Sequence, residues 1–382
     1  MDKGNLLDQL SKKVLEWMDE VMPSLGKQWK VFILSFVAQF VISSLLSLGI
    51  RAPRMFSFLA VPAVKWESSV LSSPIPEKLN IFNFLKPKLE EKINNFQLQK
   101  ETSFITSTYA AADYEEASAY IVVDSDSGEV LANKNLSQRL PVASLTKIMT
   151  AVIALDLSSP DETFTVPQRA SLVEPTTIGV VPGERMTLQE LLQASLMTSA
   201  NDAVEVIREG VDQKYGQEVF VKAMNEKASI LGLKDTHFQN PQGFDNPGQY
   251  SSVADLAVLS HYALTQYPLV SETAHKDYQF LPADLDHKQF DLYNWNGLLD
   301  VYPGVSGLKI GNTDDAGYTT VVVSERDGHK LMVVLLGAPG VLERDLWASQ
   351  LLDLGFGKFN LSPVGITEAE LRAKYATWKY FN

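Results

Sequence analysis

Residues 141–151 read PVASLTKIMTA and decide how this chain is interpreted, because they place a serine and a lysine three positions apart. Side chains at i and i+3 lie on one face of a helix, about a single turn apart. A helix beginning here would make the hydroxyl of Ser144 and the amine of Lys147 neighbours. A serine hydroxyl is unreactive at its own pKa and needs a base. The pair therefore predicts a nucleophile beside its own base, provided that the lysine is deprotonated by burial and a nearby cation.

Two further motifs follow along the chain, Ser199-Ala200-Asn201 and Lys309-Ile310-Gly311. Their order after Ser144-Leu145-Thr146-Lys147 resembles the S-x-x-K, S-x-N and K-T-G series of serine acyl-transfer enzymes that react with penicillin. All three motifs occur in the expected order. The single departure is Ile310, which stands where the series has threonine.

The resemblance extends to whole segments. It is carried by residues 141–151, 197–203 (MTSANDA), 246–252 (NPGQYSS), 293–299 (YNWNGLL) and 307–318 (GLKIGNTDDAGY). These segments resemble the serine D-alanyl-D-alanine carboxypeptidases, the low-molecular-mass penicillin-binding proteins. The similarity covers roughly Ala117 to Phe359 with order and spacing intact, and it implies a carboxypeptidase acting on peptidoglycan stem peptides that end in D-Ala-D-Ala. β-Lactams would be its inhibitors.

The resemblance also implies roles for individual residues. Ser144 would be the nucleophile with Lys147 as its base, Ser199 would relay a proton to the leaving amine, and Asn201 would bind the substrate amide. The expected catalytic residues are therefore Ser144, Lys147 and Ser199.

The third motif is expected on a strand beside the nucleophile. Lys309 would supply positive charge, and Gly311 would let a substrate backbone approach closely. The N–H of Asn312 would complete an oxyanion hole with that of Ser144. The resemblance implies that the family's threonine donates a hydrogen bond to the terminal carboxylate of the substrate. Ile310 lacks this hydroxyl, so weaker or altered substrate binding is predicted rather than loss of the reaction.

The fold expected from local patterns is α+β. Hairpins are predicted at 120–132 and at 319–336, the second with Asp327-Gly328 in its turn. Between them, a capping box at Thr187 opens one helix, and residues 252–265 form another; residues 342–354 could cover the sheet. The prediction is one antiparallel sheet flanked by helices, with an inserted all-helical lobe. The resemblance implies the same β-lactamase-like, DD-peptidase-like fold.

The N-terminal part contains an uncharged run at 31–50, VFILSFVAQFVISSLLSLGI. About 20 helical residues cross a bilayer core of about 30 Å, so an uncleaved transmembrane signal anchor is predicted. A buried core helix and a cleaved signal peptide are the alternatives, but the 30 preceding residues are long and acidic for the latter. The expected organisation is a cytoplasmic segment at 1–30, the anchor at 31–50, a connector at 51–113, the catalytic domain at 114–360 and a helical tail at 361–382. The connector is expected to carry a short amphipathic helix through Leu89, Ile93 and Phe96.

Composition excludes several other functions. The 382 residues carry a net charge of −13 and no cysteine. Residues 1–100 hold 13 basic and 9 acidic side chains, which leaves 20 against 37 for the remainder. An acidic globular part is a poor binder of nucleic acid. The five histidines form no HExxH, and neither a Walker A string nor a dinucleotide glycine pattern occurs, so no metal or cofactor is predicted.

Two other functions stay open at this stage. A β-lactamase would need a glutamate that drives deacylation, and Glu174 precedes the Ser-Ala-Asn motif rather than following it, which disfavours this function. A non-catalytic, membrane-anchored peptidoglycan-binding protein is conceivable because of Ile310. In the preferred interpretation the protein lies in the cytoplasmic membrane as a single-pass protein, with its catalytic domain on the extracytoplasmic side.

Overall fold

The computed structural model describes residues 81–99 and 113–378. The chain divides into two units, Met1–Lys78 and Leu79–Asn382, and every described residue belongs to the second. The predicted segments 1–30 and 31–50 lie outside the described residues. Within the described ranges, no helix has the length and apolar character needed to span a bilayer.

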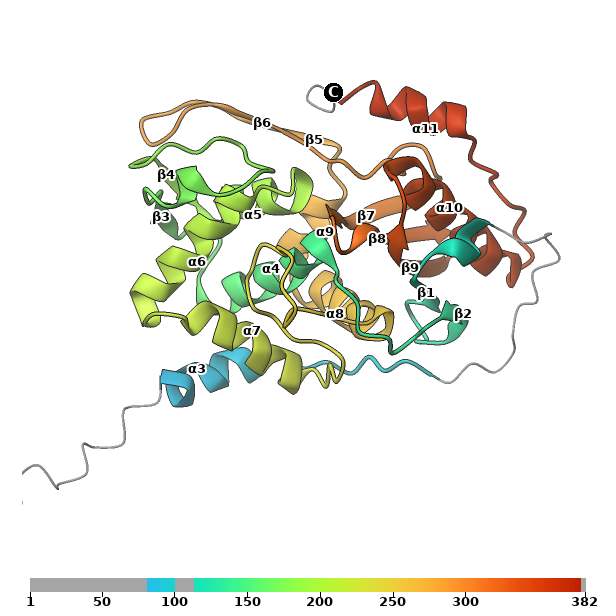
Figure 1. Cartoon of the computed structure of the whole chain (residues 1–382), viewed down its shortest axis with the longest axis horizontal. Helices are drawn as coiled ribbons and strands as arrows, with labels where there is room; N and C mark the ends of the chain where they lie inside the picture. Colours follow the sequence, from blue (N-terminus) through green and yellow to red (C-terminus); the bar gives the residue numbers. More distant parts are fainter. Residues whose placement is uncertain (1–80, 100–112, 379–382) are drawn as a thin grey trace, which may run out of the picture. The chain divides into compact units, whose positions relative to one another are not determined.

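A five-stranded antiparallel sheet joins the two ends of the catalytic domain (Figure 1). Its strand order is β2-β1-β9-β8-β7, so the first strand pairs with the last, and Ala119 faces Leu336. The strands are β1 (Ala119–Asp124), β2 (Val130–Lys134), β7 (Val305–Thr313), β8 (Gly317–Arg326) and β9 (His329–Ala338). Both hairpins predicted from the sequence are present, and β7 forms one edge of the sheet.

Both faces of the sheet are covered, which explains why its strands are continuous apolar runs. Alternate residues point to opposite faces. Val323 and Val334 enter one apolar core with the inserted lobe, whereas Val322 and Val333 enter a second core with the C-terminal helix α10 (Val341–Gly357). The sheet is thus the middle layer of three.

The inserted lobe lies between β2 and β7 in the chain. Its helices are α4 (Thr146–Leu157), α5 (Leu188–Met197), α6 (Asn201–Tyr215), α7 (Val219–Ile230), α8 (Val253–Gln266) and α9 (Pro268–Ala274). The capping box at Thr187 and the N-cap at Ser252 are both present. The prediction of an all-helical lobe is wrong, because the lobe also contains two short hairpins. These are β3 (Thr163–Thr165) with β4 (Arg185–Thr187), and β5 (Tyr278–Leu281) with β6 (Phe290–Tyr293).

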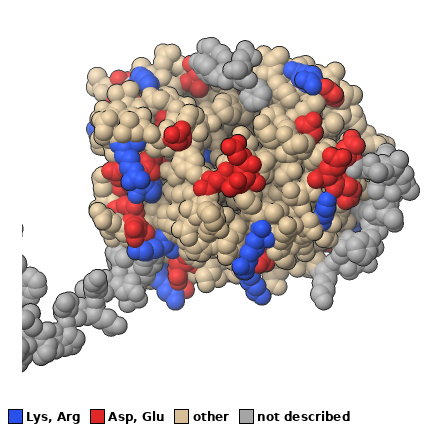
Figure 2. Space-filling model, in the orientation of Figure 1, with Lys and Arg blue, Asp and Glu red and all other residues tan. Residues whose placement is uncertain are grey.

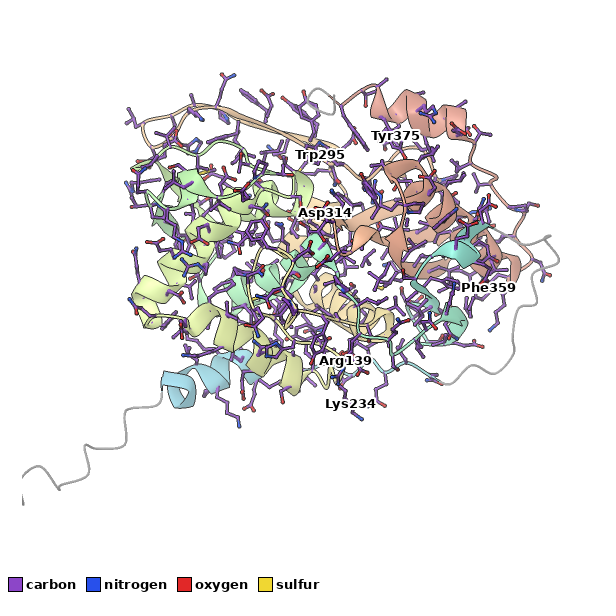
Figure 3. The ribbon with its side chains drawn as sticks, viewed as in Figure 1. Arg139, Lys234, Trp295, Asp314, Phe359 and Tyr375 are labelled. Atoms are coloured by element: carbon purple, nitrogen blue, oxygen red, sulfur yellow. The ribbon has the colours of Figure 1, made fainter. Side chains whose placement is uncertain are left out.

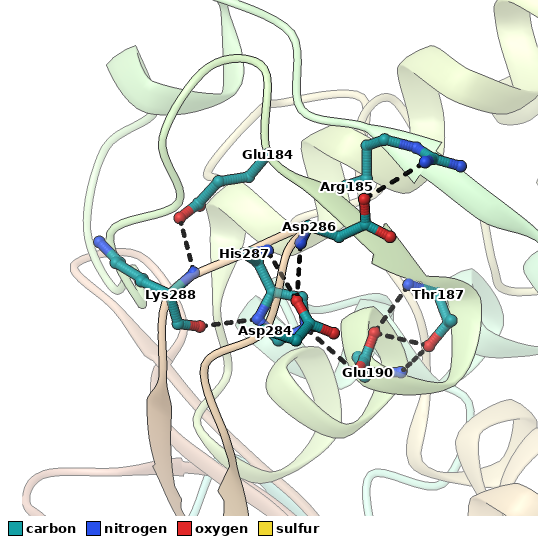
Figure 4. Close-up of polar contacts among 8 residues, drawn as sticks. All are labelled: Glu184, Arg185, Thr187, Glu190, Asp284, Asp286, His287 and Lys288. Atoms are coloured by element: carbon teal, nitrogen blue, oxygen red, sulfur yellow. Dashed lines mark hydrogen bonds and ion pairs between the residues drawn. The ribbon is translucent and has the colours of Figure 1, made fainter.

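The two hairpins of the lobe are bonded to each other (Figure 4). The turn between β5 and β6 reaches the β4 region and the start of α5 through polar contacts that no periodicity in the sequence reveals. The contacts are Lys288 N–H to Glu184 Oε1 (3.1 Å), Arg185 Nη1 to Asp286 Oδ1 (3.2 Å) and His287 Nε2 to Glu190 Oε1 (3.3 Å). They tie the β5–β6 hairpin to the lobe.

The helix expected through Leu89, Ile93 and Phe96 lies elsewhere, and this part of the prediction is wrong. Helix α3 spans Ile81–Glu90, and the chain is extended beyond it. Leu89 is fully buried against the lobe, whereas Ile93 is 69% exposed. The side chain of Asn94 accepts the N–H of Phe96 (3.1 Å), a local bond that competes with helix continuation.

The tail after α10 contains the predicted helix. Helix α11 (Glu368–Tyr375) begins with a capping box in which Thr367 and Glu370 bond to each other's backbone N–H. Leu371 and Trp378 are buried. The tail therefore packs on the domain through apolar side chains as well as through its cap.

Candidate active site

Ser144 lies in a short 3₁₀ turn, η3 (Ala143–Leu145), that leads directly into α4. Ala143 has a φ of 50°, a left-handed value that is uncommon for a residue with a side chain. The turn is held from the sheet, because the hydroxyl of Thr319 donates to Val142 O (3.3 Å). It is held from the lobe by Gly243, whose backbone lies so close that an added Cβ would be 2.0 Å from Ala143 O.

Lys147 is fully buried in the first turn of α4, directly behind Ser144. Its Nζ lies 2.7 Å from Ser144 Oγ, and it donates to Asn201 Oδ1 (2.7 Å) and to Gln242 O (2.7 Å). These three contacts fix the amine against the hydroxyl, as the i and i+3 spacing predicted.

Electrostatics favour the neutral amine. Burial, and then the nearby charge of Lys309, lower the pKa of Lys147 well below its usual value, while the carboxylate of Asp202 acts in the opposite direction. Lys309 is itself buried on β7, and burial together with Arg344 lowers the pKa of Lys309 to about 7. A lowered pKa favours the neutral amine, and a neutral amine can accept a proton from a serine.

The Ser-Ala-Asn motif joins α5 to α6. Ser199 adopts a φ of 62° between the helices, whereas Asn201 is the first residue of α6 rather than part of a loop. The side-chain amide of Asn201 donates to Glu174 O (3.0 Å), and its backbone N–H donates to Thr176 O (2.7 Å). Asn201 therefore connects Lys147 with the segment that leads into β4.

The next residue secures that same segment. The carboxylate of Asp202 is buried and accepts the backbone N–H groups of Ile178 (3.1 Å), Gly179 (2.8 Å) and Val180 (3.1 Å). Residues 174–180 are thus fastened to the start of α6 beside the nucleophile.

Strand β7 carries Lys309, Gly311 and Asn312 past the nucleophile. A Cβ added to Gly311 would lie 2.7 Å from Ser144 N and 2.9 Å from Thr319 Oγ1, so only glycine allows this approach of strand and turn. The ammonium group of Lys309 donates to Ile310 O (2.9 Å).

Four of the seven predicted site residues, Ser144, Ser199, Asn201 and Asn312, line one cleft of about 100 Å³, and the other three lie behind it. Lys147 and Gly311 lie against Ser144, and Lys309 is close enough to Lys147 to lower its pKa. The residues that line the cleft are Ser144, Pro175, Thr176, Ser199, Asn201, Gln242, Gly243, Phe244, Trp295, Ile310, Asn312 and Thr313.

Eight residues of the cleft lining were not predicted as site residues: Pro175, Thr176, Gln242, Gly243, Phe244, Trp295, Ile310 and Thr313. Gln242 and Phe244 lie outside every motif, so no local signal could have found them. Trp295 and Thr313 lie within segments that carried the resemblance, but no motif position marks them. Trp295 and Thr313 both line the cleft, and Asp314, labelled with Trp295 in Figure 3, follows Thr313 directly after β7. Among the described residues, no cluster of His, Asp or Glu has the arrangement of a metal site.

A buried lysine against a serine at the start of a helix, between an antiparallel sheet and a helical lobe, defines the class of serine acyl-transfer enzymes that react with penicillin. Residues 106–340 match the family model described as D-alanyl-D-alanine carboxypeptidase. The chain therefore belongs to the D-alanyl-D-alanine carboxypeptidase family of peptidases.

Curated relatives agree with this assignment. The D-alanyl-D-alanine carboxypeptidase DacF of Bacillus subtilis is 34% identical over 274 residues, which are 69% of this chain and 69% of the relative. The D-alanyl-D-alanine carboxypeptidase DacB2 of Mycobacterium tuberculosis is 33% identical over 257 residues, which are 65% of this chain and 85% of the relative.

Solved structures share the fold. An evolved penicillin-binding protein homologue from Mycobacterium tuberculosis has a TM-score of 0.58 and 31% identity, covering 66% of this chain and 94% of its own. Penicillin-binding protein D2 from Listeria monocytogenes, with ampicillin bound, has a TM-score of 0.54 and 30% identity, covering 63% of this chain and 97% of its own.

Proposed function

We propose that this protein is a serine D-Ala-D-Ala carboxypeptidase that trims peptidoglycan stem peptides through an acyl-enzyme on Ser144. The observation that carries the proposal is the 2.7 Å contact between Ser144 Oγ and the buried amine of Lys147, in a chain of this family. The same chemistry makes β-lactams inhibitors, because their strained amide acylates the same hydroxyl.

The donor count of Lys147 supports its role as the base. A neutral amine has two N–H groups and one lone pair. Asn201 Oδ1 and Gln242 O accept the two N–H groups, which leaves the lone pair directed at Ser144 Oγ. Lys147 can therefore take the hydroxyl proton as Oγ attacks the carbonyl carbon of the penultimate D-alanine.

The remaining residues handle charge and the leaving group. The backbone N–H groups of Ser144 and Asn312 would stabilise the oxyanion, and one such donor is typically worth about 2.7–4 kcal/mol. Ser199 would carry the proton to the departing nitrogen, so that D-alanine leaves with a neutral amine group. Water then hydrolyses the ester on Ser144 and restores the hydroxyl. Asn201 would orient Lys147 as well as the substrate amide.

Covalent labelling with a fluorescent penicillin tests the proposal. The wild-type protein should form a stable adduct, and Ser144→Ala should abolish both labelling and D-alanine release while the fold is retained. Ser171→Ala, which removes an exposed serine hydroxyl, is the matched control. Labelling of Ser144→Ala would show that Ser144 is not the nucleophile. Rapid loss of label from the wild type would indicate a β-lactamase, and absence of labelling would indicate a non-catalytic binding protein.

We also propose that residues 31–50 anchor the protein in the cytoplasmic membrane with the catalytic domain outside. The uncharged run of 20 residues supports this placement. Protease added to intact spheroplasts should degrade the catalytic domain. Protection of that domain until the membrane is lysed would contradict the orientation.

A further inference from the structure

The wall of the cleft formed by Ile310 and Trp295 is apolar. Ile310 lines the cleft from β7 with its side chain 5% exposed, and Trp295 lines it half-buried from the segment after β6. Phe244 adds a third apolar side chain. Ile310 and Phe244 offer an anion no hydrogen-bond donor, and the indole N–H is the only donor in the side chain of Trp295, whereas a carboxylate moved out of water needs donors or a cation in return.

The hydroxyl on β7 that is nearest to Ile310 in the sequence, that of Thr313, is already hydrogen-bonded. Thr313 donates its single hydroxyl proton to Asp245 Oδ1 (2.6 Å), and its oxygen accepts the N–H of Ala316 (3.2 Å). The other oxygen of Asp245 accepts the N–H of Asp315 (3.2 Å). Thr313 therefore cannot replace the hydroxyl that Ile310 lacks without breaking its bond to Asp245.

No cation offsets this loss. The described residues that line the cleft include neither lysine nor arginine. Lys309 lies 1% exposed and bonded to Ile310 O, with its pKa lowered to about 7 by burial and by Arg344. Arg344 is buried, its guanidinium donates twice to Asp345 (2.7 and 2.8 Å), and a further N–H reaches Trp295 O (3.2 Å).

The surface around Thr313, beside the cleft, is negatively charged. Asp245, Asp314 and Asp315 are exposed around Thr313. Figure 2 shows acidic side chains gathered at the centre of the same face on which Figure 3 labels Asp314. A free carboxylate entering here would meet like charges, whereas a carboxamide would not.

We propose that the cleft does not select a free carboxylate on the leaving residue. It should therefore cleave a D-Ala-D-amino acid bond at least as well when the carboxyl group of the leaving residue is an amide as when it is free. Cross-linked peptides in which the residue after D-alanine has no free carboxylate are the corresponding natural class, and cleavage of their internal bonds adds an endopeptidase activity. The inference rests on the proposed acyl transfer at Ser144. The bond changes are those of trimming: the Oγ–C bond forms, the C–N bond breaks, the amine leaves with the serine proton, and water restores Ser144. Only the group at the far end of the leaving residue differs.

A matched pair of peptides tests the inference. Diacetyl-L-Lys-D-Ala-D-Ala and its C-terminal carboxamide differ only in that terminal group, and the release of D-alanine or D-alaninamide gives kcat/KM for each. We expect an amide-to-acid ratio of one or more for the full-length wild-type protein. Ile310→Thr should lower the ratio by roughly tenfold, because the threonine hydroxyl bonds more strongly to a charged carboxylate than to a neutral carboxamide.

Ile310→Val is the matched control, since valine has the shape of threonine without its hydroxyl, and its ratio should equal that of the wild type. A wild-type preference for the acid of tenfold or more would overturn the inference. An unchanged ratio in Ile310→Thr, or an equal drop in Ile310→Val, would overturn the role of Ile310.

The two proposals fail in different ways. If penicillin labels Ser144 while the acid is preferred, the acyl-transfer function stands and only the substrate inference falls. If neither peptide is cleaved and penicillin does not label Ser144, both are overturned. Penicillin labelling of each Ile310 variant also shows that the variant is folded.

Discussion

At the scale of single residues, the site depends on two buried amines that disfavour each other's protonation. Burial, and then the charge of Lys309, lowers the pKa of Lys147, and burial, and then the charge of Arg344, lowers the pKa of Lys309 to about 7. Burial and the neighbouring positive charges therefore favour the neutral form of Lys147, which is the form that can act as a base.

Lys309→Met should move the acidic limb of the pH profile of penicillin acylation to higher pH. With the neighbouring charge removed, protonated Lys147 is less disfavoured, so its pKa rises and the base is lost at a higher pH as the pH falls. Lys309→Arg keeps the charge and should leave the limb near its wild-type position. The measured quantity is the midpoint of the limb, which a uniform loss of rate does not shift. An identical midpoint in Lys309→Met and wild type would contradict the coupling.

At the scale of elements, the segment 174–180 forms part of the cleft only because it is fastened to α6. Asp202 supplies three of the fastening bonds, and Asn201 supplies two more. Pro175 and Thr176 line the cleft. The shape of the site therefore depends on a carboxylate that does not itself line it.

Asp202→Asn should loosen this segment. The amide has nearly the same shape, but it carries no charge and offers fewer acceptors to Ile178, Gly179 and Val180. We expect the free energy of unfolding to fall by about 1–3 kcal/mol and amide hydrogen exchange at 178–180 to accelerate. Glu209→Gln, on the same helix but without a bond to the segment, is the control. Unchanged exchange at 178–180 would show that other contacts hold the segment.

Elements with local signals were predictable from the sequence, whereas those set by distant contacts were not. The caps at Thr187 and Ser252 each involve residues three apart, so the sequence contains both partners. The position of α3 is different, since Leu89 is fixed by packing on the distant lobe and Asn94 ends the pattern locally.

In the active site, too, the residues with a local sequence signal were predictable, whereas the features set by distant contacts were not. The motifs identified Ser144, Ser199, Asn201 and Asn312 in the lining of the cleft, but the bond between Thr313 and Asp245 joins positions 68 residues apart. No spacing rule predicts it. The apolar wall at Trp295 likewise depends on where the segment after β6 runs in three dimensions.

At the scale of the whole molecule, a buried charge joins the N-terminal helix α3 to the lobe. Lys227 is fully buried, pairs with Asp156 (2.7 Å), and bonds to Tyr262 Oη (3.0 Å) and to the backbone oxygen of Leu89. Burial raises the pKa of Asp156 even though Lys227 acts against the shift. Removing one member of such a pair leaves the other without compensation.

Lys227→Met should therefore reduce the free energy of unfolding by about 3–5 kcal/mol, measured by urea denaturation. The double variant Lys227→Met/Asp156→Asn should recover most of that loss, because it removes both charges. Penicillin acylation per folded molecule should be unchanged in both. A loss below about 1 kcal/mol in Lys227→Met would mean that the pair contributes little to stability.

The pairing of β1 with β9 also governs the order in which the domain can be completed during synthesis. Ala119 faces Leu336, so the centre of the sheet has no occupant until nearly the whole catalytic domain has left the ribosome. Pairing of such distant segments is slow, because the intervening chain loses entropy before any contact is gained. The lobe has more local contacts and can form earlier. Since β7 follows the lobe in the chain, the oxyanion side of the cleft cannot form before that strand has been synthesised. An incomplete chain would then carry the serine and its lysine without the strand that makes them reactive.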